Sequence, residues 1–224
     1  MHLSPLDELT SEITQCRRCP RLVAWREEVA VQRRAAFADQ VYWGRPVPGF
    51  GDPDARVAVV GLAPAAHGGN RTGRVFTGDR SGDWLFSALW RAGMANQPRS
   101  VGIDDGLELS GAYVLAAVRC APPQNKPTPA ERDECRPFLH RELGLLVRLR
   151  VVVALGQFAY QVLAQELGLR PRPRFGHGVE AVVPDGPTVI CSYHPSQQNT
   201  FTGKLTEPMF DAVFDRAGVL AGLR

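Results

Sequence analysis

The chain has 224 residues, of which 44% are hydrophobic and 22% are charged, and its formal net charge is +3. This length and composition are sufficient for one sizeable hydrophobic core and differ from those of a disordered chain. No apolar stretch reaches the roughly 20 residues that a membrane-spanning helix requires, so the sequence predicts no insertion into a bilayer.

Four cysteines stand out by their spacing. Cys16 and Cys19 form a Cys-x-x-Cys pair near the N-terminus, and Cys120 and Cys135 follow much later in the chain. The first residues lack the basic and apolar stretches and the cleavage site of an export signal, so we expect a cytoplasmic protein with reduced thiols rather than disulfides. Paired cysteines in that compartment predict a metal centre that joins the N-terminal segment to the body. The spacing leaves zinc and an iron–sulfur cluster open. Cys191 lies in an apolar run and is interpreted as a buried hydrophobic residue.

Strand and helix patterns alternate along the chain. Short apolar, β-branched runs predict buried strands at residues 56–62, 113–118, 151–155 and 188–191. Helical patterns cover residues 83–92, 130–149, 158–167 and 207–223. A weak strand at residues 179–183 is expected to pair with the last strand as an edge. We therefore predict an α/β fold, a three-layer sandwich with a central four-stranded, mostly parallel sheet flanked by helices. Residues 1–224 are expected to form one domain, with residues 1–25 as an annex held by the metal centre.

The segments after these strands are the candidate site, because ligands of open α/β sheets bind beyond the carboxyl ends of the strands. Residues 61–79 are rich in glycine but match neither a phosphate-binding P-loop nor Gly-x-Gly-x-x-Gly. Each residue singled out here also has a structural interpretation: Phe76 as a core residue, Asp79 as a helix N-cap and His194 as an ordinary loop histidine. The histidines at positions 67, 140 and 177 are interpreted as structural or exposed.

Several motifs together resemble the uracil-DNA glycosylase superfamily. They are the Cys-x-x-Cys pair, the turn at residues 61–65 with Phe76 after it, the proline-rich stretch at residues 120–127 before Cys135, and His194-Pro195-Ser196. Within the superfamily the chain is most similar to an iron–sulfur prokaryotic branch, family 5 or type B, over roughly residues 12–215.

The resemblance implies a function and a set of residues for it. The activity would be hydrolysis of the N-glycosidic bond between a damaged base and deoxyribose after base flipping, leaving an abasic site in DNA. The family's 4Fe-4S ligands map onto Cys16, Cys19, Cys120 and Cys135, and the cluster is expected to be structural. His194 matches the position of the donor to the departing base, and Phe76 can stack on that base. The segment that presses into the groove matches the loop from Ser196 to Lys204, with candidate wedge residues Gln197, Gln198 and Asn199.

The chain also departs from the family pattern. Where many relatives place a polar residue to position water, it has Leu62, Ala65 and Ala66, and Ala116 stands where the uracil-reading asparagine is expected. The type B resemblance carries the catalytic carboxylate onto Asp79 and a second polar pocket residue onto Asn125. The remaining expected pocket residues are Ala63, Ala65 and Phe76. A pocket with fewer polar partners predicts a wider substrate range that includes hypoxanthine and xanthine.

Two other functions stay open at this point. The chain could be a catalytically weak sensor of DNA damage, or a redox-responsive DNA-binding protein, that uses the same cleft. A nucleoside hydrolase is less favoured, because the loop after His194 is longer than a closed nucleoside pocket needs. The expected partner is DNA that contains deaminated bases, and the expected state is a monomer.

Overall fold

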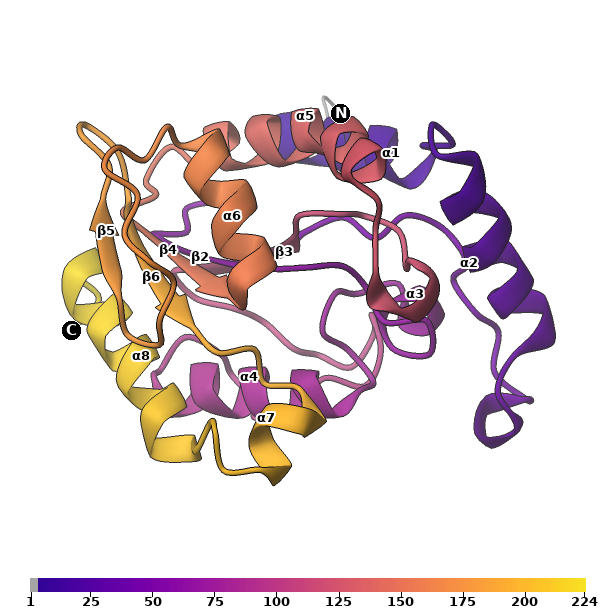
Figure 1. The fold of residues 1–224 in the computed structure, drawn as a ribbon. Coiled ribbons are helices and arrows are strands. Elements are labelled where there is room, and N and C mark those ends of the chain that lie inside the picture. Colours follow the sequence, from indigo (N-terminus) through magenta and orange to yellow (C-terminus); the bar gives the residue numbers. More distant parts are fainter. Residues whose placement is uncertain (1–3) are drawn as a thin grey trace.

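A computed structural model describes residues 4–224. It has three layers, with a central six-stranded sheet in the order β1-β3-β2-β4-β6-β5 between two layers of helices (Figure 1). The four inner strands are parallel: β2 (Val57–Gly61), β3 (Ala112–Ala116), β4 (Val151–Leu155) and β6 (Thr188–Ser192). They are the four predicted apolar runs. Nearly every side chain in them is buried, which explains why these runs do not alternate between apolar and polar residues.

The two edges of the sheet are antiparallel. β5 (Glu180–Val182) pairs with β6 and confirms the predicted weak strand. β1 (Phe50–Gly51) pairs with β3 and was not predicted, because two residues carry no periodicity that a sequence pattern can detect. The three-layer α/β prediction is thus confirmed, with a sheet two strands wider than the four expected.

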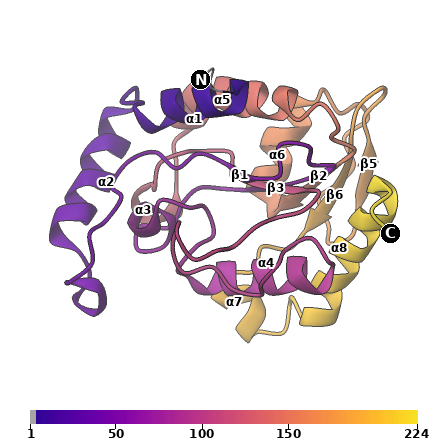
Figure 2. The ribbon, with the colours of Figure 1, turned by 180° about the vertical axis from the view of Figure 1, so that it is seen from behind.

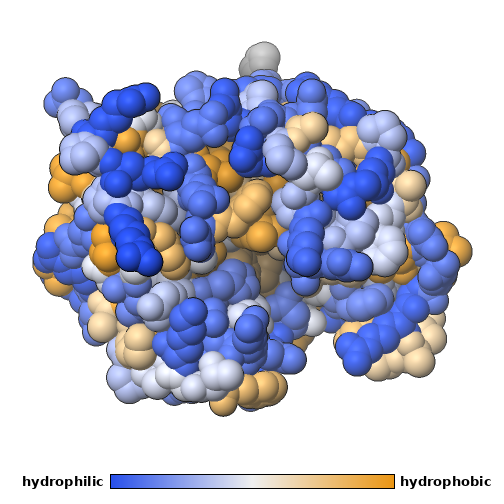
Figure 3. All heavy atoms as spheres, in the orientation of Figure 1, coloured by the Kyte–Doolittle hydropathy of each residue, from blue (hydrophilic) through white to orange (hydrophobic). Residues whose placement is uncertain are grey.

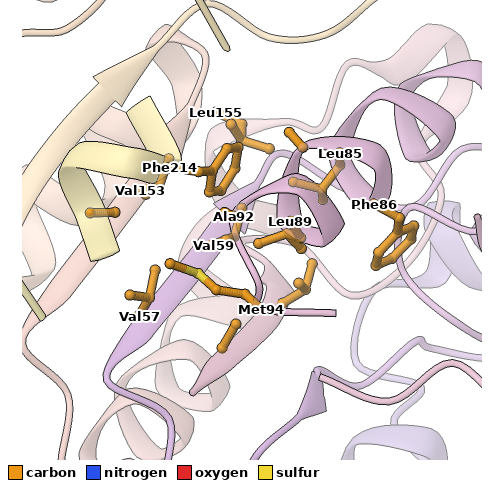
Figure 4. Packing of buried hydrophobic residues seen from close by; sticks show 14 of the residues in the cluster. Val57, Val59, Leu85, Phe86, Leu89, Ala92, Met94, Val153, Leu155 and Phe214 are labelled. Carbon is orange, nitrogen blue, oxygen red and sulfur yellow. The ribbon is translucent and has the colours of Figure 1, made fainter. Parts of the chain in front are cut away.

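Two of the main helices lie on each face of the sheet (Figure 1). α5 (Pro129–Leu145) and α6 (Gln157–Glu166) cover one face, and α4 (Arg80–Arg91) and α8 (Glu207–Ala221) cover the other. Figure 4 shows the second face from close by: Leu85 and Leu89 of α4 and Phe214 of α8 pack with Val57 and Val59 of β2. These four helices confirm the predicted helical segments, apart from shifts of a few residues at their ends.

The N-terminal segment lies outside the sheet. α1 (Pro5–Thr14) packs against α5, where Leu9 and Ile13 contact Phe138. α2 (Pro20–Gln32) continues to the side of α3 (Gly69–Thr72), as the view from behind also shows (Figure 2). The short elements that complete the fold are η1 (Ala35–Phe37), η2 (Pro123–Asn125) and α7 (Gln197–Phe201). Between residues 4 and 224, no helix is both long and apolar enough to cross a membrane.

Candidate active site

A cleft of about 790 Å³ opens beyond the carboxyl ends of the parallel strands. The strand ends are level there, because Gly61 of β2 pairs with Ala116 of β3 and Leu155 of β4 pairs with Ser192 of β6. The hollow near the centre of the face in Figure 3 lies between the positions of α6, α7 and α3 in Figure 1. Eight residues singled out in the sequence line this cleft: Ala63, Ala65, Phe76, Asp79, Asn125, His194, Ser196 and Gln197.

Phe76 provides an aromatic wall in a strained backbone conformation. Its φ angle is 54°, in the left-handed region that phenylalanine rarely adopts. The ring lies so close to the end of β2 that a Cβ atom on Gly61 would sit 2.5 Å from its Cζ atom. Only glycine fits there. The Phe76 and His194 rings face each other with their centroids 5.9 Å apart and their planes inclined by 31°. Strain of this kind often occurs at functional sites.

His194 projects into the cleft as a neutral imidazole. Burial lowers the pKa of this histidine from 6.5 to about 4. Its backbone carbonyl accepts a hydrogen bond from the Asn199 amide at 2.9 Å, which fixes the position of the residue. Within residues 4–224 no side-chain hydrogen bond holds the ring, which leaves a ring N–H free to donate to a bound molecule.

Asp79 uses one carboxylate oxygen to cap a helix. Its Oδ1 atom accepts a hydrogen bond from the Gly82 backbone N–H at 3.0 Å, at the N-terminus of α4. The Oδ2 atom lies against Gly68, where any Cβ atom would collide with it. Burial raises the pKa of the carboxyl group above its usual value, although backbone N–H groups at Gly82 and Ser81 oppose the shift. A desolvated carboxylate with an oxygen free for water is a competent general base.

Asn125 reaches the cleft from the end of η2. Gln124 and Asn125 both have positive φ angles, of 55° and 56°, and both line the cleft. The two residues form a tight turn that the proline-rich sequence around them favours. Their side-chain amides are the neutral polar groups that η2 contributes to the cleft.

The polar loop after His194 folds into α7 and serves two purposes. Ser196 and Gln197 line the cleft. Asn199 instead braces His194, and the Lys204 ammonium lies 4.8 Å from the centre of the Tyr193 ring. Gln198 is exposed, and its backbone carbonyl accepts a hydrogen bond from the Thr202 hydroxyl at 2.7 Å. The wedge role of this loop stays a prediction.

The four paired cysteines converge where the N-terminal segment meets the body. Cys120 and Cys135 are buried in one small cluster with Cys19 against it, and Cys16 packs against a second cluster formed by Leu9, Ile13 and Phe138. All five cysteines of the chain are free thiols. Burial, together with the neighbouring Cys135 and Cys16, raises the pKa of Cys19 to about 11. No group of three or more His, Cys, Asp or Glu side chains placed to hold a metal ion is found among residues 4–224.

Hydrogen-bond donors surround these sulfur atoms. The buried Arg26 guanidinium lies 2.9 Å from the Cys120 Sγ atom, and its Nε atom has no hydrogen-bond partner among residues 4–224. Burial raises the pKa of the Cys135 thiol, and the Arg119 backbone N–H opposes this rise. A buried cation and a backbone N–H directed at sulfur suit anionic thiolates better than neutral thiols. The donor set therefore fits an anionic cluster, and the expected iron–sulfur centre stays a prediction.

Comparison with known proteins identifies the family. The sequence model of the uracil DNA glycosylase superfamily matches residues 48–218. The chain belongs to the uracil DNA glycosylase superfamily. It is 57% identical over 219 residues to the type-5 uracil-DNA glycosylase of Mycobacterium tuberculosis. That alignment covers 96% of this chain and 82% of the relative. It is 55% identical to the Thermus thermophilus type-5 uracil-DNA glycosylase, over 94% of this chain and 96% of the relative. Identity falls to 27% with the type-4 uracil-DNA glycosylase of Archaeoglobus fulgidus, in an alignment that covers 98% of this chain and 95% of the relative.

In this uracil DNA glycosylase superfamily member, sequence patterns missed one wall of the cleft. Trp25, Arg34 and Phe37, from α2, the loop after it and η1, all line the cleft. The only sequence signal for them is that they follow the Cys-x-x-Cys pair expected beside the site. His67, interpreted as structural or exposed, also lines the cleft, and its Nδ1 atom lies 3.0 Å from the Tyr42 hydroxyl. Burial lowers the pKa of His67, so that it too is neutral near pH 7.

Proposed function

We propose that this protein removes uracil from DNA by hydrolysing the N-glycosidic bond. The observation that carries the proposal is the neutral His194 ring, free of side-chain partners and facing Phe76 across a cleft that also contains Asp79. The relatives named as type-5 uracil-DNA glycosylases support the same reaction. A cleft of about 790 Å³ accommodates one extruded base with its sugar.

The departing base is the part of the reaction that His194 stabilises. When the C1′–N bond breaks, its electron pair leaves with the base, and negative charge develops on the carbonyl oxygens of the ring. A neutral imidazole N–H donates a hydrogen bond to such an oxygen and strengthens that bond as the charge grows. Phe76, packed beside His194, stacks on the same base.

Water attacks the sugar carbon under the control of Asp79. The free Oδ2 atom accepts a proton as the water oxygen bonds to C1′, so the products are an abasic site and the free base. The same carboxylate charge stabilises the oxocarbenium character of the sugar in the transition state. The raised pKa of Asp79 makes it a stronger base than an exposed aspartate.

The range of bases is proposed to extend to hypoxanthine and xanthine. Leu62, Ala63, Ala65 and Ala66 line the cleft without a polar side-chain atom. A pocket rejects an analogue strongly only when its buried polar groups lose their partners. With few such groups, this cleft discriminates weakly among deaminated bases.

An iron–sulfur cluster is proposed at Cys16, Cys19, Cys120 and Cys135. When bound, the cluster would supply a structural crosslink, since hydrolysis of a glycosidic bond transfers no electrons. Arg26 would balance its negative charge through the contact with the Cys120 sulfur. The crosslink would hold residues 1–25, and therefore the cleft wall formed by Trp25, in one domain with the sheet.

Excision assays on defined duplexes test the proposal. Purified protein is incubated with duplexes that carry one uracil, hypoxanthine, xanthine or cytosine, and abasic sites are then cleaved with alkali. We expect cleavage of the three deaminated bases, reduced about 10²–10³-fold in His194→Ala and in Asp79→Ala. His140→Ala and Asp133→Ala, at exposed positions on α5, are the matched controls and should keep full activity. Binding of every lesion duplex without cleavage would contradict the enzymatic role and favour a damage sensor.

A further inference from the structure

An arginine–proline segment connects α6 to β5 and carries an unusual density of charge. Its sequence is Arg170-Pro171-Arg172-Pro173-Arg174, and all three arginine side chains are exposed. Figure 3 shows strongly hydrophilic side chains projecting on the left of the hollowed face, where Figure 1 places the connection that crosses in front of β5 and β6. The segment thus lies on the same face of the molecule as the cleft.

These three arginines have no ion-pair partner in the described part of the chain. Some other exposed arginines are paired, such as Arg91 with Asp211 and Arg216 with Glu180. Arg170 and Arg172 also line a groove of about 510 Å³, together with Arg132, Gln161 and Gln165. No acidic side chain lines that groove, although Arg132 is paired with the adjacent Asp133. The groove therefore presents donors and positive charge to the solvent.

The segment is anchored to the active site through aromatic contacts. The buried Tyr160 hydroxyl donates to the Pro173 carbonyl at 2.6 Å. Phe175, directly after Arg174, packs between Tyr160 and Tyr193, with ring centroids 5.9 Å and 6.2 Å apart. Tyr193 directly precedes His194. The two prolines restrict the backbone, so little conformational entropy remains to be lost when the segment binds a ligand.

We propose that the arginine–proline segment binds the phosphates of the DNA duplex beside the extruded nucleotide. Guanidinium groups donate in a fork that matches two phosphate oxygens. Phe175, which directly follows Arg174, lies 6.2 Å from Tyr193 by ring centroids. Because phosphates recur about every 3.4 Å of axis along one strand, we expect these arginines within a few nucleotides of a base held at His194. The inference rests on the proposed function and adds a second DNA contact, separate from α7.

A binding experiment isolates this contact from catalysis. The probe is a duplex of about 25 base pairs with a central tetrahydrofuran abasic analogue, titrated by fluorescence anisotropy from about 50 to about 300 mM KCl. In Arg172→Gln/Arg174→Gln we expect the slope of log K against log salt to become shallower by about 2 units. Affinity near 100 mM salt should fall roughly tenfold or more, while the melting temperature and the single-turnover excision rate at saturating enzyme stay unchanged.

The chain offers a matched control with the same spacing and charge. Arg148 and Arg150 are exposed and have no ion-pair partners in the described residues. They directly precede β4, at the amino ends of the parallel strands, whereas the cleft lies beyond the carboxyl ends. Arg148→Gln/Arg150→Gln should keep the wild-type slope and affinity. An unchanged slope in Arg172→Gln/Arg174→Gln, or an equal loss in the control, overturns the inference. If wild-type protein fails to excise uracil, the proposed function fails instead, whatever the slopes are.

Discussion

Asp79 combines an observed structural function with the catalytic function proposed for it. One carboxylate oxygen caps α4, which confirms the structural interpretation of its sequence position, and the other remains free beside Gly68. Because burial raises the pKa of this carboxyl group, its ionised form is disfavoured in the folded protein. Its charge at neutral pH therefore lowers the stability of the fold while it serves the proposed reaction.

Asp79→Asn should separate these two functions. Asparagine is an equally good N-cap, so we expect the free energy of unfolding at pH 7 to stay the same or rise by up to ~1 kcal/mol. Excision should fall ~10²-fold or more, because the amide cannot accept the proton. Any gain in stability should shrink as the pH falls and vanish near about pH 3, below the unfolded-state pKa of about 3.9, where the wild-type carboxyl is protonated in both states. Urea unfolding at about pH 7 and about pH 3 checks this, with Asp79→Ala, expected to lose about 1 kcal/mol at neutral pH, as the comparison. Full activity in the asparagine variant would contradict the role of Asp79.

At the scale of elements, α7 turns a polar loop into a short helix at the mouth of the cleft. The sequence suggested a wedge made by Gln197, Gln198 and Asn199, but Asn199 holds the His194 carbonyl. Phe201, at the end of α7, is 65% exposed, and the Arg80 guanidinium lies 4.4 Å from the centre of its ring. An exposed aromatic side chain next to a DNA-repair cleft is suited to fill the space left by a flipped nucleotide.

Phe201→Ser should therefore weaken duplex processing more than single-strand processing. We expect about a tenfold slower excision of uracil from duplex DNA, which corresponds to one lost base–aromatic contact of ~1–3 kcal/mol. Excision from a single strand, which leaves no gap to fill, should change less than threefold. The measurement is single-turnover kinetics on both substrates, with Trp90→Ser, an exposed aromatic in the last turn of α4, as the control. An equal loss on both substrates would point to a role within the cleft instead.

At the scale of the whole molecule, the N-terminal segment both encloses the cleft and carries half of the cysteine set. α1 packs against α5, and Trp25 of α2 lines the cleft. Beside Cys120, the fully buried Arg119 and Glu142 form an ion pair of 2.5 Å, with the Tyr113 hydroxyl also donating to Glu142. Removing either charge of such a buried pair typically destabilises a protein by ~3–5 kcal/mol. The proposed cluster thus lies beside a buried ion pair on which the stability of the fold depends.

Cys120→Ser tests whether the cluster is structural. We expect a joint loss of iron, of visible absorbance and of about 10 °C or more in melting temperature, because the proposed ligand set is incomplete. Cys191→Ala, which changes the buried cysteine outside the set, should keep its iron and lose only a few degrees. Iron analysis and thermal unfolding of both variants provide the comparison. Normal stability in Cys120→Ser with only its catalysis lost would contradict the structural role.

The sequence by itself determined the inner strands, the main helices and the end of the parallel strands at which the site lies. β2, β3, β4 and β6 are predictable because apolar, β-branched runs fit a strand that is buried on both faces. Asp79, Phe76 and His194 are predictable because the carboxyl ends of parallel strands meet at one edge. These are local patterns, set by the side chains and the backbone of a few neighbouring residues.

Only the tertiary structure decided which distant segments complete the site. That Trp25 and Phe37 form a wall of the cleft depends on how α1 and α2 pack against the body. That the arginine–proline segment lies near Tyr193 depends on the contacts of Phe175 with Tyr160 and Tyr193, and that Phe201 stays exposed depends on where α7 ends. Such contacts join residues far apart in the chain, so no local periodicity records them; they follow from packing the whole fold.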